Sequence, residues 1–180
     1  MLIKEHDLLR LLKDPVKKNG AFKNLVEQYK EQLYWVIRKV LLNHDDTDDV
    51  LQNTFMKIYL NIDNFNQNSK LFTWMYRIAI NESINFINKK SKQVGLSNSE
   101  YIEEEAKKLE SDVYFDGNKA ELKLQQTIST LPPKQRMIFS MRYFDEMPFK
   151  QISKILSTTE GALRASYHQA VKKIKNELEK

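Results

Sequence analysis

Five polar side chains recur at every fourth position of an otherwise apolar stretch, residues 71–90. They are Thr73, Arg77, Asn81, Asn85 and Lys89. Residues four apart share one face of an α-helix, so these side chains form a single row. Hydroxyl, amide and guanidinium groups in such a row can form hydrogen bonds with an external partner. A row that is exposed only to water is the alternative interpretation.

A second row of polar side chains lies near the C-terminus. Two short segments with helical spacing of apolar residues, 148–156 and 163–178, flank a turn at 157–161, which is a helix-turn-helix pattern. The outward positions of the second segment are Arg164, Ala165, His168, Gln169, Lys172 and Lys175. Arg and Gln can read base edges in the major groove of DNA, and Lys can contact phosphates. The pattern predicts DNA binding, although it also occurs by chance in helical proteins.

Groups of residues suited to catalysis are missing from the sequence. Cysteine is absent, the three histidines are far apart, and the four glycines are isolated, so no thiolate site, His-rich metal motif or phosphate-binding loop can be recognised. Four acids at 45–49 precede a segment of helical spacing, where acids stabilise a helix start, so a metal site is the weaker interpretation. We expect no enzymatic activity, no metal and no cofactor.

The apolar residues predict helices that would carry these rows. Spacings of three and four run from Phe22 to Leu41 and again from Leu51 to Ile62, whereas residues 61–70 are polar and Asn-rich apart from Phe65 and predict a loop. Residues 122–131 and 135–144 predict two more helices. Ser157 and Thr159 are both possible caps for the last helix, whose expected inward stripe is Leu163, Tyr167, Ala170, Val171, Ile174 and Leu178. Only four Gly and four Pro argue against a turn-rich β fold, so we expect an all-α protein.

Charge divides the chain into three parts. Residues 1–92 carry 15 basic and 11 acidic side chains, residues 93–120 carry 3 and 7, and residues 121–180 carry 11 and 6. Two basic parts around an acidic one suggest two modules that contact one polyanion. We expect two small helical domains, 1–92 and 121–180, joined by an acidic linker, 93–120, that acts as a tether with one helical stretch. Acids near the start, and the lack of a long apolar run, predict a cytoplasmic protein.

Four motifs resemble those of bacterial sigma factors of the sigma-70 family. Asp48-Asp49-Val-Leu-Gln52-Asn-Thr-Phe55 resembles the core-binding pattern acid-Asp-x-x-Gln-x-x-Phe. Residues 72–81 are similar to Phe-x-x-Trp-Leu-Tyr-x-Ile-Ala-x-Asn, residues 131–139 to Leu-Pro-x-x-x-Arg-x-x-Phe, and residues 149–170 to the family's helix-turn-helix. The short linker points to the extracytoplasmic-function (ECF) type, which has regions 2 and 4 only.

This resemblance implies a factor that binds core RNA polymerase and directs promoter recognition, DNA melting and transcription initiation. The implied core-binding residues are Asp48, Asp49, Gln52 and Lys57. The implied contacts with the −10 element are Asn64, Phe65, Asn66, Lys70, Trp74, Arg77, Asn81, Asn85 and Lys89, and the loop 63–70, with Phe65 as a stacking surface, would hold a base flipped from the non-template strand. The implied contacts with the −35 element are Arg136, Gly161, Arg164, His168, Gln169 and Lys172.

The resemblance also implies the partners. They are core RNA polymerase, through its β′ clamp helices and its β flap, promoter DNA and a cognate anti-sigma factor, with no stable homo-oligomer. The acidic linker would pass through the polymerase channel that later carries RNA. The recognition segment reads Ala162-Leu163-Arg164-Ala165-Ser166 where the family usually has Thr-Val-Lys/Arg-Ser-Arg, and Gln169 replaces a common Arg. The resemblance therefore does not specify the −35 sequence.

Two other functions remain open at the level of sequence. A dimeric helix-turn-helix regulator that binds operators alone would explain residues 148–178, but it leaves Asp49, Gln52 and the segment around Trp74 without a role. If the chain is instead a helical protein-interaction module, both polar rows are ordinary solvated faces and the chain does not contact DNA. Transcription by core polymerase, with and without the chain, distinguishes the three.

Overall fold

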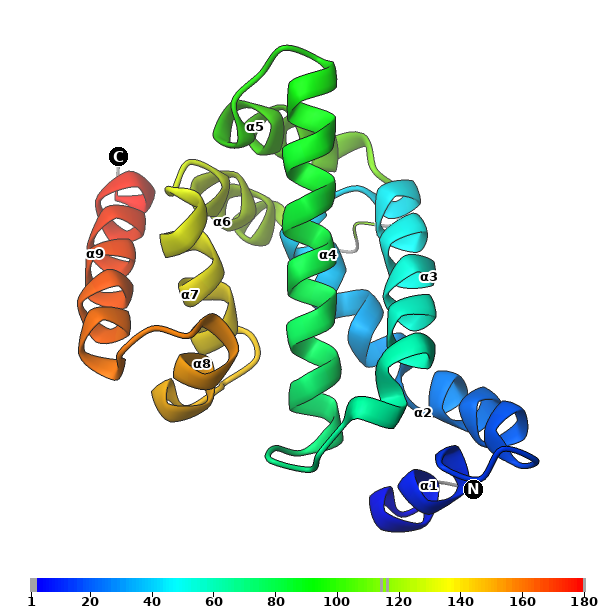
Figure 1. The fold of residues 1–180 in the computed structure, drawn as a ribbon. Helices are drawn as coiled ribbons and strands as arrows, with labels where there is room; N and C mark the ends of the chain where they lie inside the picture. The colour runs from blue at the N-terminus through cyan, green and yellow to red at the C-terminus, as the bar shows by residue number, and fades with distance from the viewer. Residues whose placement is uncertain (1–2, 114, 116, 180) are drawn as a thin grey trace.

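The computed structural model describes residues 3–113, 115 and 117–179, and within these ranges all regular structure is helical (Figure 1). The α-helices are α1 (Glu5–Leu12), α2 (Lys18–Leu41), α3 (His44–Asn61), α4 (Leu71–Gln93), α5 (Asn98–Lys108), α6 (Lys119–Ser129), α7 (Pro133–Tyr143), α8 (Phe149–Leu156) and α9 (Glu160–Leu178). Two 3-10 turns, η1 (Ile62–Asn64) and η2 (Leu109–Ser111), follow α3 and α5. The expected all-α fold is confirmed. In the described ranges, no helix combines the length and the apolarity that crossing a membrane would need.

Helices α1 to α4 form a first module around one apolar core. Helices α2, α3 and α4 pack against one another, and α1 packs on α2. Leu25, Leu33, Ile37, Ile58 and Met75 are completely buried between them. Burial of a side chain of this size stabilises a fold by about 1.5–3 kcal/mol, so these contacts fix how α4 is held.

Helix α3 begins where the sequence places four acids at a helix start, and its cap is the residue just before His44. The side chain of Asn43 is the N-cap, because its Oδ1 accepts a hydrogen bond from the backbone N–H of Asp46 (3.0 Å). Asp45 and Asp46 lie in the first turn, where their charges interact favourably with the helix dipole.

Helices α6 to α9 form a second module that contains the helix-turn-helix. Thr159 caps α9 by accepting a hydrogen bond from the N–H of Ala162 (3.4 Å), whereas Ser157 ends α8 in a left-handed conformation (φ 51°). Of the two possible caps, Thr159 is therefore the one used. The expected inward stripe of α9 is partly wrong, because Val171 and Leu178 are exposed.

The described part of the acidic segment between the modules is packed as well as helical, most clearly over residues 97–111. A capping box of Ser97 and Glu100 starts α5, which contacts both α4 and α6. Tyr101, Ile102 and Leu109 are buried, and the Tyr101 hydroxyl donates to Asp46 of α3 (2.9 Å). In this arrangement the segment is a docked element rather than a free tether.

The two modules also touch each other directly. Helix α8 packs against α4, the long central helix in Figure 1. Ile138, Met141, Met147 and Ile152 of the second module belong to the same cluster of buried apolar residues as the core of the first. One cluster of buried apolar residues therefore joins modules whose sequences suggested separate domains. The second module also has a separate core of its own, formed by Ile128, Leu131, Phe139, Ala170 and Ile174.

Candidate nucleic-acid interface

The α4 row, defined as Thr73, Arg77, Asn81, Asn85 and Lys89, lies along one face of α4. Its last four members are exposed, and Thr73 is half-buried. Neighbouring helices bury the opposite face, where Met75 and Ala79 are inaccessible to solvent. The sequence spacing therefore produces a continuous hydrogen-bonding surface on a helix that is rigidly held.

A polar hollow of about 540 Å³ lies beside the α4 row. Its lining includes Lys57, Asn61, Asn64, Trp74, Arg77 and Asn81. Amide groups can pair with the edge of a base, and an indole ring can stack on its face. The hollow thus offers both kinds of contact that a single unpaired base requires.

The end of η1 and the loop that follows it present Asn64, Asn66 and Lys70 to solvent but not Phe65. The expectation that Phe65 stacks on a flipped base is wrong for this arrangement, because the residue is only 3% exposed. Its ring packs against Trp74, with the centroids 5.2 Å apart. Burial of the ring anchors the loop, which leaves Trp74 as the aromatic side chain that faces the hollow.

The outer face of α3 carries Asp49 and Gln52 in exposed positions, as expected for a contact surface. Met56 and Leu60 continue the same face and are 55% and 66% exposed, although the sequence interpretation missed them. They stand outside the apolar stripe of Leu51, Phe55, Ile58 and Ile62, and that irregularity is the signal by which they could have been found.

Two of the expected core-binding residues lie beside this face. Lys57 is turned toward α4, where its ammonium group pairs with Glu82 (2.6 Å). Asp48 lies on the other side and faces His44 across 3.5 Å, one helical turn earlier. Asp48 and Lys57 are therefore engaged by neighbouring side chains, whereas Asp49, Gln52, Met56 and Leu60 are exposed.

The α9 row, defined as Arg164, His168, Gln169 and Lys172, is exposed along its whole length. The guanidinium of Arg164 lies over the ring of Phe149, 4.7 Å from its centroid, and pairs with Glu160 (3.4 Å). Gly161 is exposed, and a Cβ there would meet nothing within 4 Å, so the backbone is open to close approach. This surface has the geometry of a recognition helix.

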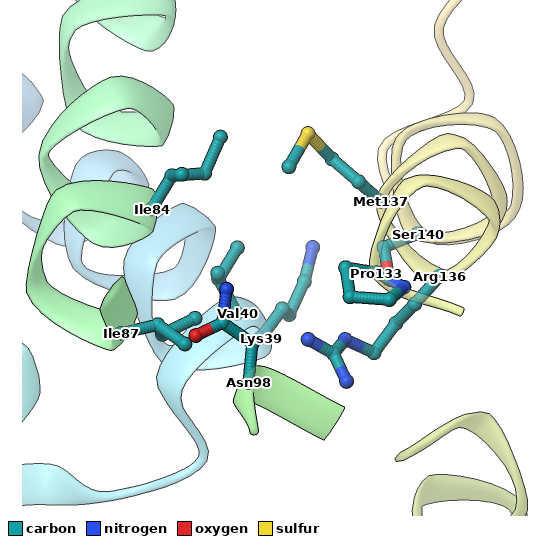
Figure 2. A pocket seen from close by; sticks show the side chains of 9 residues that line it. All are labelled: Lys39, Val40, Ile84, Ile87, Asn98, Pro133, Arg136, Met137 and Ser140. Carbon is teal, nitrogen blue, oxygen red and sulfur yellow. The ribbon is translucent and has the colours of Figure 1, made fainter. Parts of the chain in front are cut away.

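Arg136 departs from the expected DNA contacts. It is 6% exposed, because the start of α7 lies between the modules, and its Nη1 donates to the carbonyl oxygen of Ser129 (3.4 Å). Figure 2 shows its side chain beside a small cavity of about 40 Å³, across from Ile84, Ile87 and Lys39. Burial lowers the pKa of Arg136 to about 10, and it cannot reach DNA while the modules are in contact.

A polar cluster that the sequence did not suggest holds the modules together. Asp145, in the turn after α7, pairs with Lys39 and accepts a hydrogen bond from the Tyr76 hydroxyl (2.7 Å). Burial, together with the nearby Asp145 carboxylate, raises the pKa of Tyr76 well above its ordinary value. Nearby, Gln151 donates to the Thr73 hydroxyl (3.3 Å), and Arg77 donates to that of Ser157 (3.5 Å). The helix-turn-helix therefore covers the first part of the α4 row.

Comparison with known proteins gives the same division of the chain. Residues 25–93 match the family model "Sigma-70 region 2", and residues 121–174 match "Sigma-70, region 4". The chain is 32% identical over 167 residues to the ECF RNA polymerase sigma factor SigW of Bacillus subtilis, covering 88% of this chain and 89% of that protein.

Solved structures share the fold at lower identity. CnrH, in complex with the cytosolic domain of CnrY, aligns with a TM-score of 0.66 at 19% identity over 97% of both chains. The sigma factor RpoE of Bartonella quintana, in complex with the anti-sigma factor NepR, aligns with a TM-score of 0.67 at 16% identity, over 88% of this chain and 96% of that one. From the matches to both sigma-70 regions and to SigW, we conclude that the chain belongs to the ECF family of RNA polymerase sigma factors.

Proposed function

We propose that different surfaces of this sigma factor contact the −10 element, the −35 element and the polymerase. The chain binds core RNA polymerase and directs it to initiate transcription at promoters. The first module would contact and melt the −10 element, and the second would read the −35 element. The observation that carries the proposal is the exposed α4 row beside the polar hollow. No chemical step is assigned to the chain itself. It would act in the cytoplasm together with the polymerase.

The −10 contact rests on the chemistry of the α4 row. Asn81 and Asn85 expose amides that can pair bidentately with adenine, and Lys89 lies one turn further along for a phosphate. Capture of one flipped base in the hollow, stacked on Trp74, would favour the melted state, because a base held there cannot pair again.

The −35 contact rests on the α9 row. Arg164 is exposed in the second turn of the helix, while Lys172 lies two turns further along. A guanidinium on a base edge would supply sequence preference, and an ammonium on a phosphate would supply affinity without it. Gly161 would let the backbone approach the DNA closely.

Two surfaces with exposed apolar side chains support the proposed contacts with the polymerase. The face of α3 with Asp49, Gln52, Met56 and Leu60 would dock on the β′ clamp helices. In the second module an open groove of about 460 Å³ is lined by Leu124, Phe139, Tyr143, Tyr167, Val171, Ile174 and Leu178, with Lys175 and Glu179 at its edge. We assign this groove to the β flap, because it leaves the α9 row free for DNA.

Promoter binding in this account requires the modules to separate. Elements centred near −10 and −35 lie about 25 base pairs apart, which is roughly 85 Å at about 3.4 Å per base pair. A folded chain of this length is only roughly 40 Å across. The residues between α4 and α6 can extend to roughly 80 Å, so undocking of α5 would allow the separation.

An anti-sigma factor is the remaining proposed partner. Both solved structures described above hold a sigma-like chain together with another protein, CnrY in one and the anti-sigma factor NepR in the other. We call the structure of this chain, in which the two modules are in contact, the closed arrangement. A partner of this kind should favour it, because Thr73, Arg77 and Arg136 already form hydrogen bonds within the chain there.

Transcription in vitro tests the proposal. Core polymerase, a promoter library and the chain should give promoter-specific transcripts that core polymerase alone does not give. The variant Asn81→Ala/Asn85→Ala should reduce them, whereas Asn24→Ala/Glu27→Ala on the exposed face of α2 should not. Tight operator binding without polymerase would instead support the dimeric regulator, and the absence of any transcript would support the interaction module.

A further inference from the structure

The N-terminal segment, residues 5–19, lies outside both ranges that match sigma-70 models, yet it contacts both ends of the loop before α4. Resting on the proposed function, we propose that this segment holds the promoter-melting loop, residues 63–70, in position. Glu5 is the principal positioning residue of this clamp.

The first anchor fixes the end of the loop. Helix α4 begins without a cap of its own, because the side chain of Lys70 at the N-cap position makes no capping hydrogen bond. Instead, Oε1 of Glu5 accepts a hydrogen bond from the backbone N–H of Leu71 (3.0 Å). That N–H has no partner within the helix, and a carboxylate is favoured at the positive end of the helix dipole. A residue 66 positions earlier thus caps the helix that carries the α4 row.

The second anchor fixes the start of the loop. Nζ of Lys18 pairs with Oδ2 of Asp63 (2.6 Å) and lies over the ring of Tyr59, 4.9 Å from its centroid. The Tyr59 hydroxyl donates to Oδ1 of Asn19 (2.8 Å). The first turn of α2 is therefore joined to the end of α3 and to η1.

The segment is itself held firmly enough to act as a clamp. Leu8, Leu9 and Leu12 of α1 are buried in the core of the first module. Between the anchors, the loop exposes Asn64, Asn66 and Lys70, which are the side chains expected to meet DNA. A loop that is already ordered loses less conformational entropy when it captures a base, so the clamp favours melting.

The first test uses the free chain and the rate at which trypsin cleaves after the exposed Lys70. Glu5→Ala removes the cap and should raise this rate about fivefold, which is the population change expected from loss of one helix cap. Glu5→Gln retains an acceptor oxygen and should behave like the unmodified chain. Asp7→Ala is the matched control, because Asp7 lies in the same turn of α1 but pairs with Arg10.

The second test uses holoenzyme on promoter DNA. Permanganate reactivity of the −10 region should fall about fivefold for Glu5→Ala and recover for Glu5→Gln, while binding to the closed duplex stays unchanged. Equal trypsin rates for Glu5→Ala and the unmodified chain would overturn the proposal, and so would faster cleavage with unaltered melting. Failure of the unmodified chain to melt any promoter would refute the proposed function instead, while the cleavage rates would still decide whether Glu5 holds the loop.

Discussion

On α9, Arg164, His168 and Lys172 extend into solvent along the whole row, whereas the row on α4 begins beneath the helix-turn-helix. Thr73 accepts a hydrogen bond from Gln151, and Arg77 donates one to Ser157. Both rows contain side chains four residues apart that can form hydrogen bonds with DNA. They differ in exposure, because the helix-turn-helix covers the first part of the α4 row and no element covers the described residues of the α9 row.

This difference separates the parts of the proposed function that the closed arrangement allows from those that it hinders. The α9 row and the α3 face with Asp49 and Gln52 are both open, so contact with a −35 element or with polymerase needs no rearrangement. Full use of the α4 row requires the modules to part. Opening would restore the hydration of Arg136, whose guanidinium is buried between the modules and whose pKa is lowered by that burial.

The largest expected effect concerns the loop of the first module. Phe65→Ala should lower the free energy of unfolding by about 3–5 kcal/mol, because a buried ring is replaced by a cavity. Asn66→Ala, at the exposed neighbouring position, should change it by less than about 0.5 kcal/mol. Urea denaturation measures both. An unchanged midpoint for Phe65→Ala would show that the ring is not part of the core, and it would return Phe65 to the role of stacking on a base.

The next effect concerns the contact that covers the α4 row. Asp145→Ala leaves Lys39 and the Tyr76 hydroxyl without their acceptor, and we expect it to weaken the closed arrangement by about 2–3 kcal/mol. Ultraviolet titration should show the pKa of Tyr76 falling toward the ordinary value. Glu146→Gln, at the next position, is the control. If Tyr76 titrates identically in Asp145→Ala and the unmodified chain, this cluster does not join the modules.

The same cluster predicts a dependence on pH. Because the pKa of Tyr76 is raised in the folded chain, the neutral hydroxyl stabilises the contact fully below about pH 10, the ordinary tyrosine pKa. That stabilisation is lost as the pH rises above this value toward the raised pKa. The fraction of chains with separated modules should therefore increase in alkaline solution. Small-angle scattering measures this as a larger radius of gyration. Asp145→Ala should show a smaller increase, and an equal increase would contradict the assignment.

On the open α9 row, Arg164 should contribute sequence preference and Lys172 should contribute affinity for any sequence. Arg164→Ala should cost about 1–3 kcal/mol in promoter binding and relax the preference at one −35 position. Lys172→Ala should weaken all sequences alike and lower the salt slope by about one unit. Each variant holoenzyme is assayed on a promoter library at two salt concentrations. Retention of the original −35 preference by Arg164→Ala would mean that α9 sits in the groove in another orientation.

The smallest effect on stability is expected on the outer face of α3. Asp49→Ala/Gln52→Ala should change the free energy of unfolding by less than about 0.5 kcal/mol, because both side chains are exposed. It should nevertheless weaken association with core polymerase. Asn24→Ala/Glu27→Ala on α2 is matched in chemistry and should leave that association intact. Equal affinities of the two variants for core polymerase would exclude the α3 face.

The sequence was sufficient to predict α2 to α4, α6 to α9 and the two polar rows, because all of them follow from spacings of three and four along the chain. It did not predict α1, which lies before the first helical pattern that we recognised. It was insufficient for Phe65 and Arg136, since a lone aromatic in a polar loop and an Arg in a helix are equally compatible with exposure and with burial. Only packing against Trp74, or against the other module, decides between them. The burial of α5 and the joining of the modules through Asp145 depend on contacts between distant residues, which local periodicity does not contain.

In the proposed function, one chain contacts two promoter elements with modules that are closed together when the chain is free. The chain has no cysteine, so spin labels at Glu31→Cys on α2 and Asn176→Cys on α9 report the distance between the modules without interference. Double electron–electron resonance on the free chain should give a distance between the two labels of less than roughly 40 Å, which is the width of the compact fold. In the holoenzyme on promoter DNA the distance should exceed roughly 60 Å, as two elements about 25 base pairs apart require. An unchanged short distance in a transcribing complex would show that the modules do not separate on promoter DNA.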